Sequence, residues 1–123
     1  MVLIDTSVWI GLYRKQESEL AQKLWLLAAR NEAAVSGQIW VEFLGGFRKQ
    51  SVRDSYQIKL GAYPFLETTR SAYVLAAGLL ATHPRLGAGD AIIAATAIET
   101  QSALFTTDRD FHALTSQGLT LFA

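Results

Sequence analysis

The sequence contains no cysteine, and this absence excludes several kinds of site. Without thiols the chain cannot form disulfides, bind zinc through thiolates or use a cysteine nucleophile. It also lacks a net charge, because eleven basic residues balance eleven acidic ones. A protein that bound nucleic acid mainly through excess positive charge would not show this balance, although a local basic strip remains compatible with it.

Long hydrophobic runs are absent as well. No uninterrupted apolar stretch approaches the ~20 residues that a membrane span requires. The residues from Met1 to Asp5 lack the basic start and the long apolar segment of a signal peptide. Half of the residues are nevertheless hydrophobic, which is enough for a sizeable core. We therefore expect a single soluble, cytoplasmic domain over residues 1–123.

Short apolar runs alternate with helix-forming segments along the chain, which favours a parallel sheet covered on both faces. The fold class that we predict is α/β, a three-layer α/β/α sandwich with a mainly parallel central sheet. Pro64 cannot donate to a ladder, so the segment around it is expected to be an edge strand or extended connector. Strands are predicted at 2–4, 33–36, 63–67, 103–106 and 119–122, and a small turn at 111–114. A first helix is predicted at about 8–15, and a second one begins after a polar break at 16–18. Further helices are predicted from 38 to 49, at 51–60, from 68 or 69 to about 82, and from 90 onward.

Four acids stand out because they lie beside apolar residues, three of them at strand ends or helix starts. They are Asp5, Glu42, Asp90 and Asp108. In a doubly wound sheet, strand ends and helix starts share one edge, so acids that are distant in sequence can meet there. Gathered carboxylates repel one another unless a cation compensates, and Mg²⁺ or Mn²⁺ prefers oxygen ligands. The joint pattern predicts an acid-lined site for a hard divalent cation.

Each acid taken alone also has a purely structural explanation. Asp5 and Asp108 could cap the helices that follow them. Asp90 could favour its helix start through the macrodipole, and Glu42 could pair with Arg48. Only the convergence of the four side chains separates the two interpretations.

Other sequence motifs give weaker support for a specific function. The segment from Gly87 to Ile92 begins like a dinucleotide-binding fingerprint, but Ile92 replaces the third glycine. No strand precedes this segment, so the context of that motif is missing. Ser7 has no sign of a histidine partner, which leaves nucleophilic serine catalysis without support.

Four segments, taken in order, resemble the PIN domain, and most of all the VapC-like toxins of type II toxin–antitoxin pairs. They are LIDTS at 3–7, VEF at 41–43, GDAIIA at 89–94 and TTDRDF at 106–111. The resemblance spans the chain and implies an α/β/α sandwich with Mg²⁺- or Mn²⁺-dependent ribonuclease activity. It also implies RNA products with 5′-phosphate and 3′-hydroxyl ends, a homodimer, and inhibition by a cognate antitoxin protein.

The resemblance also implies roles for individual residues. The catalytic acids of the family fall on Asp5, Glu42, Asp90 and Asp108, with Asp5, Asp90 and Asp108 as the metal ligands and Glu42 acting on the attacking water. Supporting hydroxyls fall on Ser7 and Thr106, and Asp110 can share or take the role of Asp108. Basic residues close in sequence to the acids are expected to contact the RNA backbone: Arg48, Lys49, Arg85 and Arg109.

Two other functions compete with this interpretation. A non-catalytic α/β interaction module would bind a partner through the apolar surface near Trp9, Leu24 and Trp25, with its acids serving only as caps. A phosphate-receiving signalling domain would need a lysine after a late strand, and no lysine follows Lys59.

Overall fold

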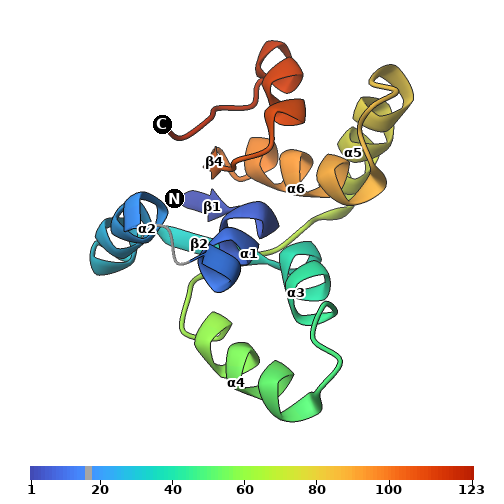
Figure 1. Ribbon diagram of the computed structural model, residues 1–123. Helices are drawn as coiled ribbons and strands as arrows, with labels where there is room; N and C mark the ends of the chain where they lie inside the picture. Colours follow the sequence, from blue (N-terminus) through green and yellow to red (C-terminus); the bar gives the residue numbers. More distant parts are fainter. Residues whose placement is uncertain (16–17) are drawn as a thin grey trace.

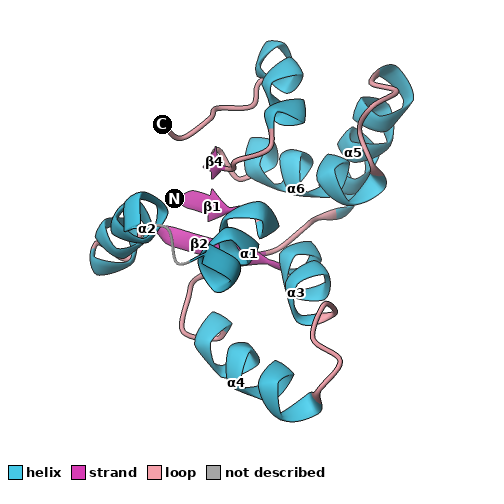
Figure 2. Ribbon diagram, in the orientation of Figure 1, coloured by secondary structure: helices cyan, strands magenta, loops and turns pink. Residues whose placement is uncertain are grey.

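The structure, a computed structural model, describes residues 1–15 and 18–123, and a parallel four-stranded sheet lies at its centre. The strand order is β3-β2-β1-β4. Ile4 of β1 pairs with Phe105 of β4, so the ends of these neighbouring strands lie at the same sheet edge. The strands are β1 (Val2–Ile4), β2 (Ala33–Ser36), β3 (Phe65–Leu66) and β4 (Ala103–Phe105) (Figure 2).

Helices surround this sheet on both sides (Figure 1). Those in the described residues are α1 (Thr6–Lys15), α2 (Ser18–Ala29), α3 (Gly37–Leu44), α4 (Gln50–Leu60), α5 (Arg70–Thr82), α6 (Ala88–Glu99) and the 3-10 helix η1 (Arg109–Gln117). Within these ranges, no helix is long and apolar enough to cross a membrane.

The two faces of the sheet pack against different helices, because successive strand residues point to opposite sides. Leu3 packs in one core cluster with α5, α6 and η1, whereas Val2 and Ile4 pack in a second cluster with α1 and α2. Figure 1 shows α6 between β4 and α5. Phe111 and Leu114 are fully buried and anchor η1, and their burial stabilises the fold by roughly 1.5–3 kcal/mol each. This arrangement confirms the predicted three-layer α/β/α sandwich.

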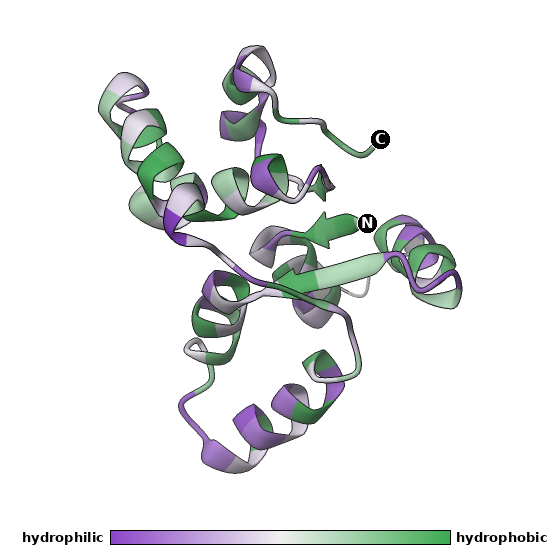
Figure 3. Ribbon diagram, turned by 180° about the vertical axis from the view of Figure 1, so that it is seen from behind, coloured by the Kyte–Doolittle hydropathy of each residue, from purple (hydrophilic) through white to green (hydrophobic). Residues whose placement is uncertain are grey.

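A third cluster joins α3 and α4 to the sheet through Val35, Phe43 and Leu60. Trp9 packs against all three clusters, and its indole N–H donates to the Ile4 carbonyl at 3.1 Å. The strands are largely green in the hydropathy colouring of Figure 3, whereas α4 carries much of the purple, as expected of a helix with one buried edge.

Several local predictions differ from the structure. The helix predicted from 38 to 49 ends at Leu44. The segment 119–122 is not a strand, because it forms only an isolated bridge between Leu121 and Leu104. The small turn expected at 111–114 is part of the longer η1, whose two buried apolar side chains hold it to the core. The strand expected at 103–106 ends at Phe105, and the hydroxyl of the next residue, Thr106, donates to Asp5. The predicted polar break at 16–18 overlaps residues that lie outside the described ranges.

The first helix also begins earlier than predicted, at Thr6. The Asp5 carbonyl accepts the Val8 N–H at 3.0 Å, so Asp5 occupies the position before the helix, and Thr6 and Ser7 lie within the first turn. This shift leaves both hydroxyls available for other hydrogen bonds.

Candidate active site

Asp5 is a buried carboxyl held by hydroxyl groups at the end of β1. The residue is only 3% exposed, and its Oδ2 accepts hydrogen bonds from Ser7 Oγ at 2.7 Å and Thr106 Oγ1 at 2.8 Å. Burial raises the pKa of this carboxyl, and the hydrogen bonds from Ser7, Thr106 and the local backbone partly oppose the rise. The predicted supporting hydroxyls therefore both contact the first acid.

The loop after β4 is hydrogen-bonded to the same two hydroxyls that contact Asp5. The Asp108 N–H donates to Thr106 Oγ1 at 3.0 Å, and the Thr107 N–H donates to Ser7 Oγ at 3.1 Å. Asp108 Oδ1 in turn accepts the Asp110 N–H at 2.9 Å and caps η1. The parallel pairing of β1 and β4 thus brings together residues that lie about a hundred positions apart in the chain.

Glu42 reaches the site from α3 and is fixed at both carboxylate oxygens. Thr6 Oγ1 donates to Oε1 at 2.8 Å, and Gln38 Nε2 donates to Oε2 at 2.9 Å. The structural alternative, in which Glu42 pairs with Arg48 or another basic residue, does not hold in the described residues, where the one ion pair joins Lys23 and Glu19. Hydrogen bonds from neutral donors orient Glu42 without cancelling its charge.

Asp90 lies in the first turn of α6 and experiences the other acids directly. Burial raises its pKa to about 6, with additional repulsion from Asp5, Asp108, Glu42 and Asp110. Gly89 lies next to it, and a Cβ at this glycine would overlap Glu42 Oε2 and stand 3.0 Å from Gln38 Nε2. The start of α6 and the middle of α3 are therefore in close contact at the acids.

The predicted acids Asp5, Glu42 and Asp108 thus all lie close enough to Asp90 to disfavour its charged form. The capping role of Asp108 is real, but it coexists with this convergence. Asp110 also contributes to the field at Asp90, so both candidates for the last acid lie near the site.

The donor set fits a hard divalent cation. It consists of carboxylate and hydroxyl oxygens, which Mg²⁺ and Mn²⁺ prefer. Among the described residues no basic side chain forms an ion pair with any of these acids. Within those residues no three His, Asp or Glu side chains are close enough to one another to form a complete ligand group. A cation at this place would offset the repulsion that raises the pKa of Asp90.

Sequence reasoning missed three residues that shape the site: Thr6, Gln38 and Gly89. Gln38 precedes Glu42 by four positions on one helix, and this spacing puts both side chains on the same face. That signal was available in the sequence. The contacts of Thr6 and Gly89 with Glu42 depend on tertiary packing and had no local signal.

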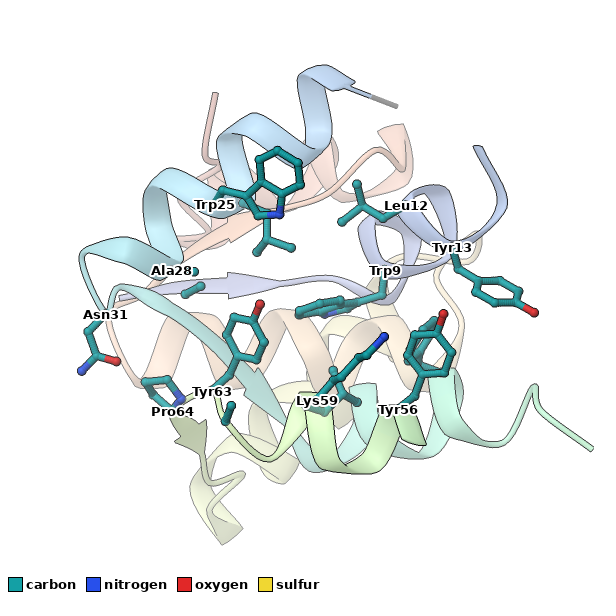
Figure 4. Close-up of a pocket in the computed structure, with 15 residues that line it drawn as sticks. Trp9, Leu12, Tyr13, Trp25, Ala28, Asn31, Tyr56, Lys59, Tyr63 and Pro64 are labelled. Atoms are coloured by element: carbon teal, nitrogen blue, oxygen red, sulfur yellow. The ribbon is translucent and has the colours of Figure 1, made fainter. Parts of the chain in front are cut away.

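A second concave feature, which we term the aromatic groove, lies apart from the acids. It has a volume of about 610 Å³ and is bordered by α1, α2, α4 and the segment before β3. Figure 4 shows Trp9 between Leu12 and Trp25 on one side and Tyr63, Lys59 and Tyr56 on the other. Trp25 is 66% exposed and thus no core residue, whereas Leu24 is buried beneath it.

Comparison with known proteins places these features in context. The family model of the PIN domain matches residues 2–116. The search of curated proteins gave no match.

Solved structures match over nearly the whole chain. A toxin–antitoxin complex from Klebsiella pneumoniae is 26% identical, with a TM-score of 0.76 and coverage of 90% of both chains. VapBC2 from Rickettsia felis, bound to a DNA fragment of its promoter, is 21% identical, with a TM-score of 0.82 and coverage of 99% of this chain and 98% of the other. VapC20 of Mycobacterium tuberculosis, a toxin that cleaves the sarcin–ricin loop, is 19% identical, with a TM-score of 0.69 and coverage of 92% and 94%.

Proposed function

This chain belongs to the PIN domain family, and from that premise we propose that it is a metal-dependent ribonuclease, the toxin of a type II toxin–antitoxin pair. The observation that carries the proposal is the convergence of the acids: Thr106 hydrogen-bonds both Asp5 and the Asp108 backbone, and Glu42 lies against Gly89, the neighbour of Asp90. Such an arrangement destabilises the protein by itself, and a bound cation would compensate for it. The resemblance noted in the sequence is confirmed at the level of the family.

We propose that Asp5, Asp90 and Asp108 hold Mg²⁺ or Mn²⁺, with Asp110 as the alternative to Asp108. The ion would supply Lewis-acid activation of water and neutralisation of phosphate charge. Ser7 and Thr106 orient Asp5, because both hydroxyls donate to one of its oxygens. The hydroxyls thereby hold the Asp5 carboxylate in one orientation.

Glu42 is the residue that we propose to act on the attacking water. A general base must have a fixed geometry within hydrogen-bond reach of the proton that it removes. Thr6 and Gln38 provide that geometry, since each donates to a different oxygen of Glu42. Remaining lone pairs of the carboxylate can accept the water proton while phosphodiester hydrolysis proceeds.

The test is an RNA cleavage assay with Mg²⁺, with Mn²⁺ and with a chelator. The wild type should cleave RNA only when a divalent ion is present, and Asp5→Asn should remove the activity while the circular dichroism spectrum stays unchanged. Glu32→Gln is the matched control, because Glu32 is an exposed acid just before β2 and outside the acid cluster. Cleavage in excess chelator, or full activity of Asp5→Asn, would refute the proposal.

We infer that the antitoxin partner covers the aromatic groove. Toxin–antitoxin complexes are among the solved structures that resemble this chain. The groove joins a highly exposed tryptophan to further aromatic rings, which is typical of a protein-binding surface. If a short reading frame adjacent to this gene encodes an antitoxin, Trp25→Ala should weaken binding of that protein at least tenfold. Asp5→Asn should bind it as the wild type does. Unchanged binding by Trp25→Ala together with weakened binding by Asp5→Asn would show that the partner binds elsewhere.

This groove also supports the competing function, a non-catalytic interaction module. That function predicts partner binding without any RNA cleavage, and without an effect of Mn²⁺ on thermal stability. The cleavage assay therefore separates the two.

We propose in addition that the protein is a homodimer. Exposed apolar side chains gather where α3, β3 and α5 meet, and Val41, Phe65 and Tyr73 line one depression there. We call this surface the α3–α5 patch. Burying it against a second copy would remove its apolar area from water.

A further inference from the structure

Another cavity, distinct from the aromatic groove, lies beside the acids, and the proposed reaction does not use it. It has a volume of about 440 Å³ and lies between the connection from α5 to α6 and the start of η1. Its charged lining residues are Arg85, Arg109 and Asp110, and His83 and Leu86 complete the adjoining walls. Asp110 also acts on Asp90, so the cavity and the acid cluster share a border.

The two arginines in this cavity are available for an outside partner. Both are exposed, and neither forms an ion pair with any other residue in the described ranges. Neither is needed to neutralise Asp110, which has no cation within ion-pair distance among those residues. The cavity therefore places two unpaired guanidinium groups directly next to a negatively charged site.

We propose that Arg85 and Arg109 form a subsite for the phosphodiester backbone of the RNA strand, adjacent to the phosphate that is cleaved. The inference rests on the proposed ribonuclease function and adds the part of the protein that holds the substrate. Guanidinium groups bind phosphate oxygens through two parallel hydrogen bonds and stay charged at every relevant pH.

The charge distribution of the molecule makes such a subsite necessary. The net charge is zero, so no overall field attracts RNA. The acid cluster would repel a polyanion, and local cations beside it offset that repulsion. Contacts of this kind position a strand without reading its sequence.

Of the four basic residues expected to contact RNA, the structure brings two together. Arg85 precedes α6 and Arg109 begins η1, and both line the cavity. Arg48 and Lys49 follow α3 and do not line it. The subsite is therefore formed by Arg85 and Arg109 alone.

The test measures RNA binding apart from cleavage. All variants are made in an Asp90→Asn background, and the probe is a short fluorescein-labelled single-stranded oligoribonucleotide of mixed sequence, followed by fluorescence anisotropy in Mg²⁺ over a range of salt. Arg85→Ala and Arg109→Ala should each weaken binding roughly three- to tenfold. Each should also reduce the slope of log K against log salt by about 0.7, the value for one lost phosphate contact on a single strand. Arg109→Lys should keep the slope, because the charge remains.

Arg30→Ala is the matched control. Arg30 is an exposed arginine just before β2, at the opposite edge of the sheet from the acids, and its loss should leave both affinity and slope unchanged. A double Arg85→Ala/Arg109→Ala variant that binds like Arg30→Ala would overturn the subsite, as would a parent protein with no measurable RNA binding at low salt. Failure of the wild type to cleave RNA would instead overturn the ribonuclease function, so the two failures are distinguishable.

Discussion

Asp90 is the residue whose state depends most on the rest of the site. A carboxyl at the start of a helix is normally stabilised in its charged form by the helix dipole. Here burial and four other carboxylates outweigh that effect and raise its pKa to about 6. The arrangement favours cation binding but lowers the free energy of unfolding of the cation-free protein. A substitution at Asp90 should therefore change the stability measurably.

Asp90→Asn should stabilise the protein in a pH-dependent way. The pKa of Asp90 is about 6 in the folded state, against a model value of 3.8, so the folded state holds a proton that the unfolded state has released between these pH values. Wild-type stability should therefore fall as the pH rises from about 4 to above 6. Asp90 is partly exposed, so solvent screening reduces the effect. We expect the free energy of unfolding of the variant to exceed that of the wild type by roughly 1 kcal/mol at pH 8, which is about 3 to 5 °C in Tm.

Thermal melts of both proteins in chelator at pH 4 and pH 8 check this prediction. The difference between the two proteins should be smallest at pH 4, where Asp90 is protonated in the folded wild type and about half protonated in its unfolded state. A variant that melts below the wild type at pH 8, or a difference of the same size at both pH values, would show that repulsion at Asp90 is not significant.

The identity of the acids could be predicted from the sequence, but the hydrogen bonds that hold them could not. Asp5, Asp90 and Asp108 stand at strand ends or a helix start, and those positions share an edge in any parallel α/β sheet. The role of Thr6 depends on the rotation of α1, which begins one residue after Asp5. No periodicity in the sequence determines that rotation.

The crossing of α3 and α6 explains why a glycine precedes Asp90. A side chain at Gly89 would occupy the space of the Glu42 carboxylate, which belongs to α3. Glu42 is flexible enough to move aside, so the two helices can remain packed. The expected cost of a substitution is therefore misplacement of Glu42 rather than unfolding.

Gly89→Ala should fold and yet lose most of its RNA cleavage. We expect a fall of at least tenfold in kcat, because a positioned general base contributes about 10²- to 10⁴-fold. Gly87→Ala is the matched control, since a Cβ at Gly87 meets no heavy atom within 4 Å. Steady-state kinetics and thermal melts of both variants provide the measurement. Equal activity in the two would contradict the role given to Glu42.

At the level of elements, the sequence predicted the order of strands and helices and failed mainly at their ends. Buried apolar runs such as Val2–Ile4 are unambiguous because a parallel strand is covered on both faces. The apolar run at 119–122 looks similar, but it contributes only one bridge, from Leu121. Whether such a run completes a ladder depends on tertiary contacts.

In residues 1–15 and 18–123, the molecule has two separate apolar surfaces and one acidic site. The aromatic groove lies among α1, α2 and α4, and the α3–α5 patch is formed by α3, β3 and α5. Gln38 borders this patch and also donates to Glu42, so a second copy bound at the patch would lie close to the site. The α3–α5 patch and the acid cluster therefore meet at Gln38, whereas the aromatic groove does not include this residue.

Val41→Asp should convert the proposed dimer to a monomer. Val41 is 69% exposed in a single copy, so the substitution should cost little folding stability while placing a charge in the α3–α5 patch. Ile58→Asp is the control, because Ile58 on α4 is 77% exposed and outside the patch. Light scattering during size-exclusion chromatography should give a dimer for the wild type and for Ile58→Asp. A monomeric wild type, or a dimeric Val41→Asp, would argue against the patch as the interface.

The central claim is that acids from distant parts of the chain together hold a divalent cation. A Mn²⁺ titration followed by electron paramagnetic resonance tests this most directly, with the wild type and Asp90→Asn compared at pH 8. We predict a saturable Mn²⁺ site in the wild type that Mg²⁺ competes for, and at least a tenfold loss of affinity in Asp90→Asn. Equal binding by the two proteins, or no saturable site in the wild type, would contradict the account.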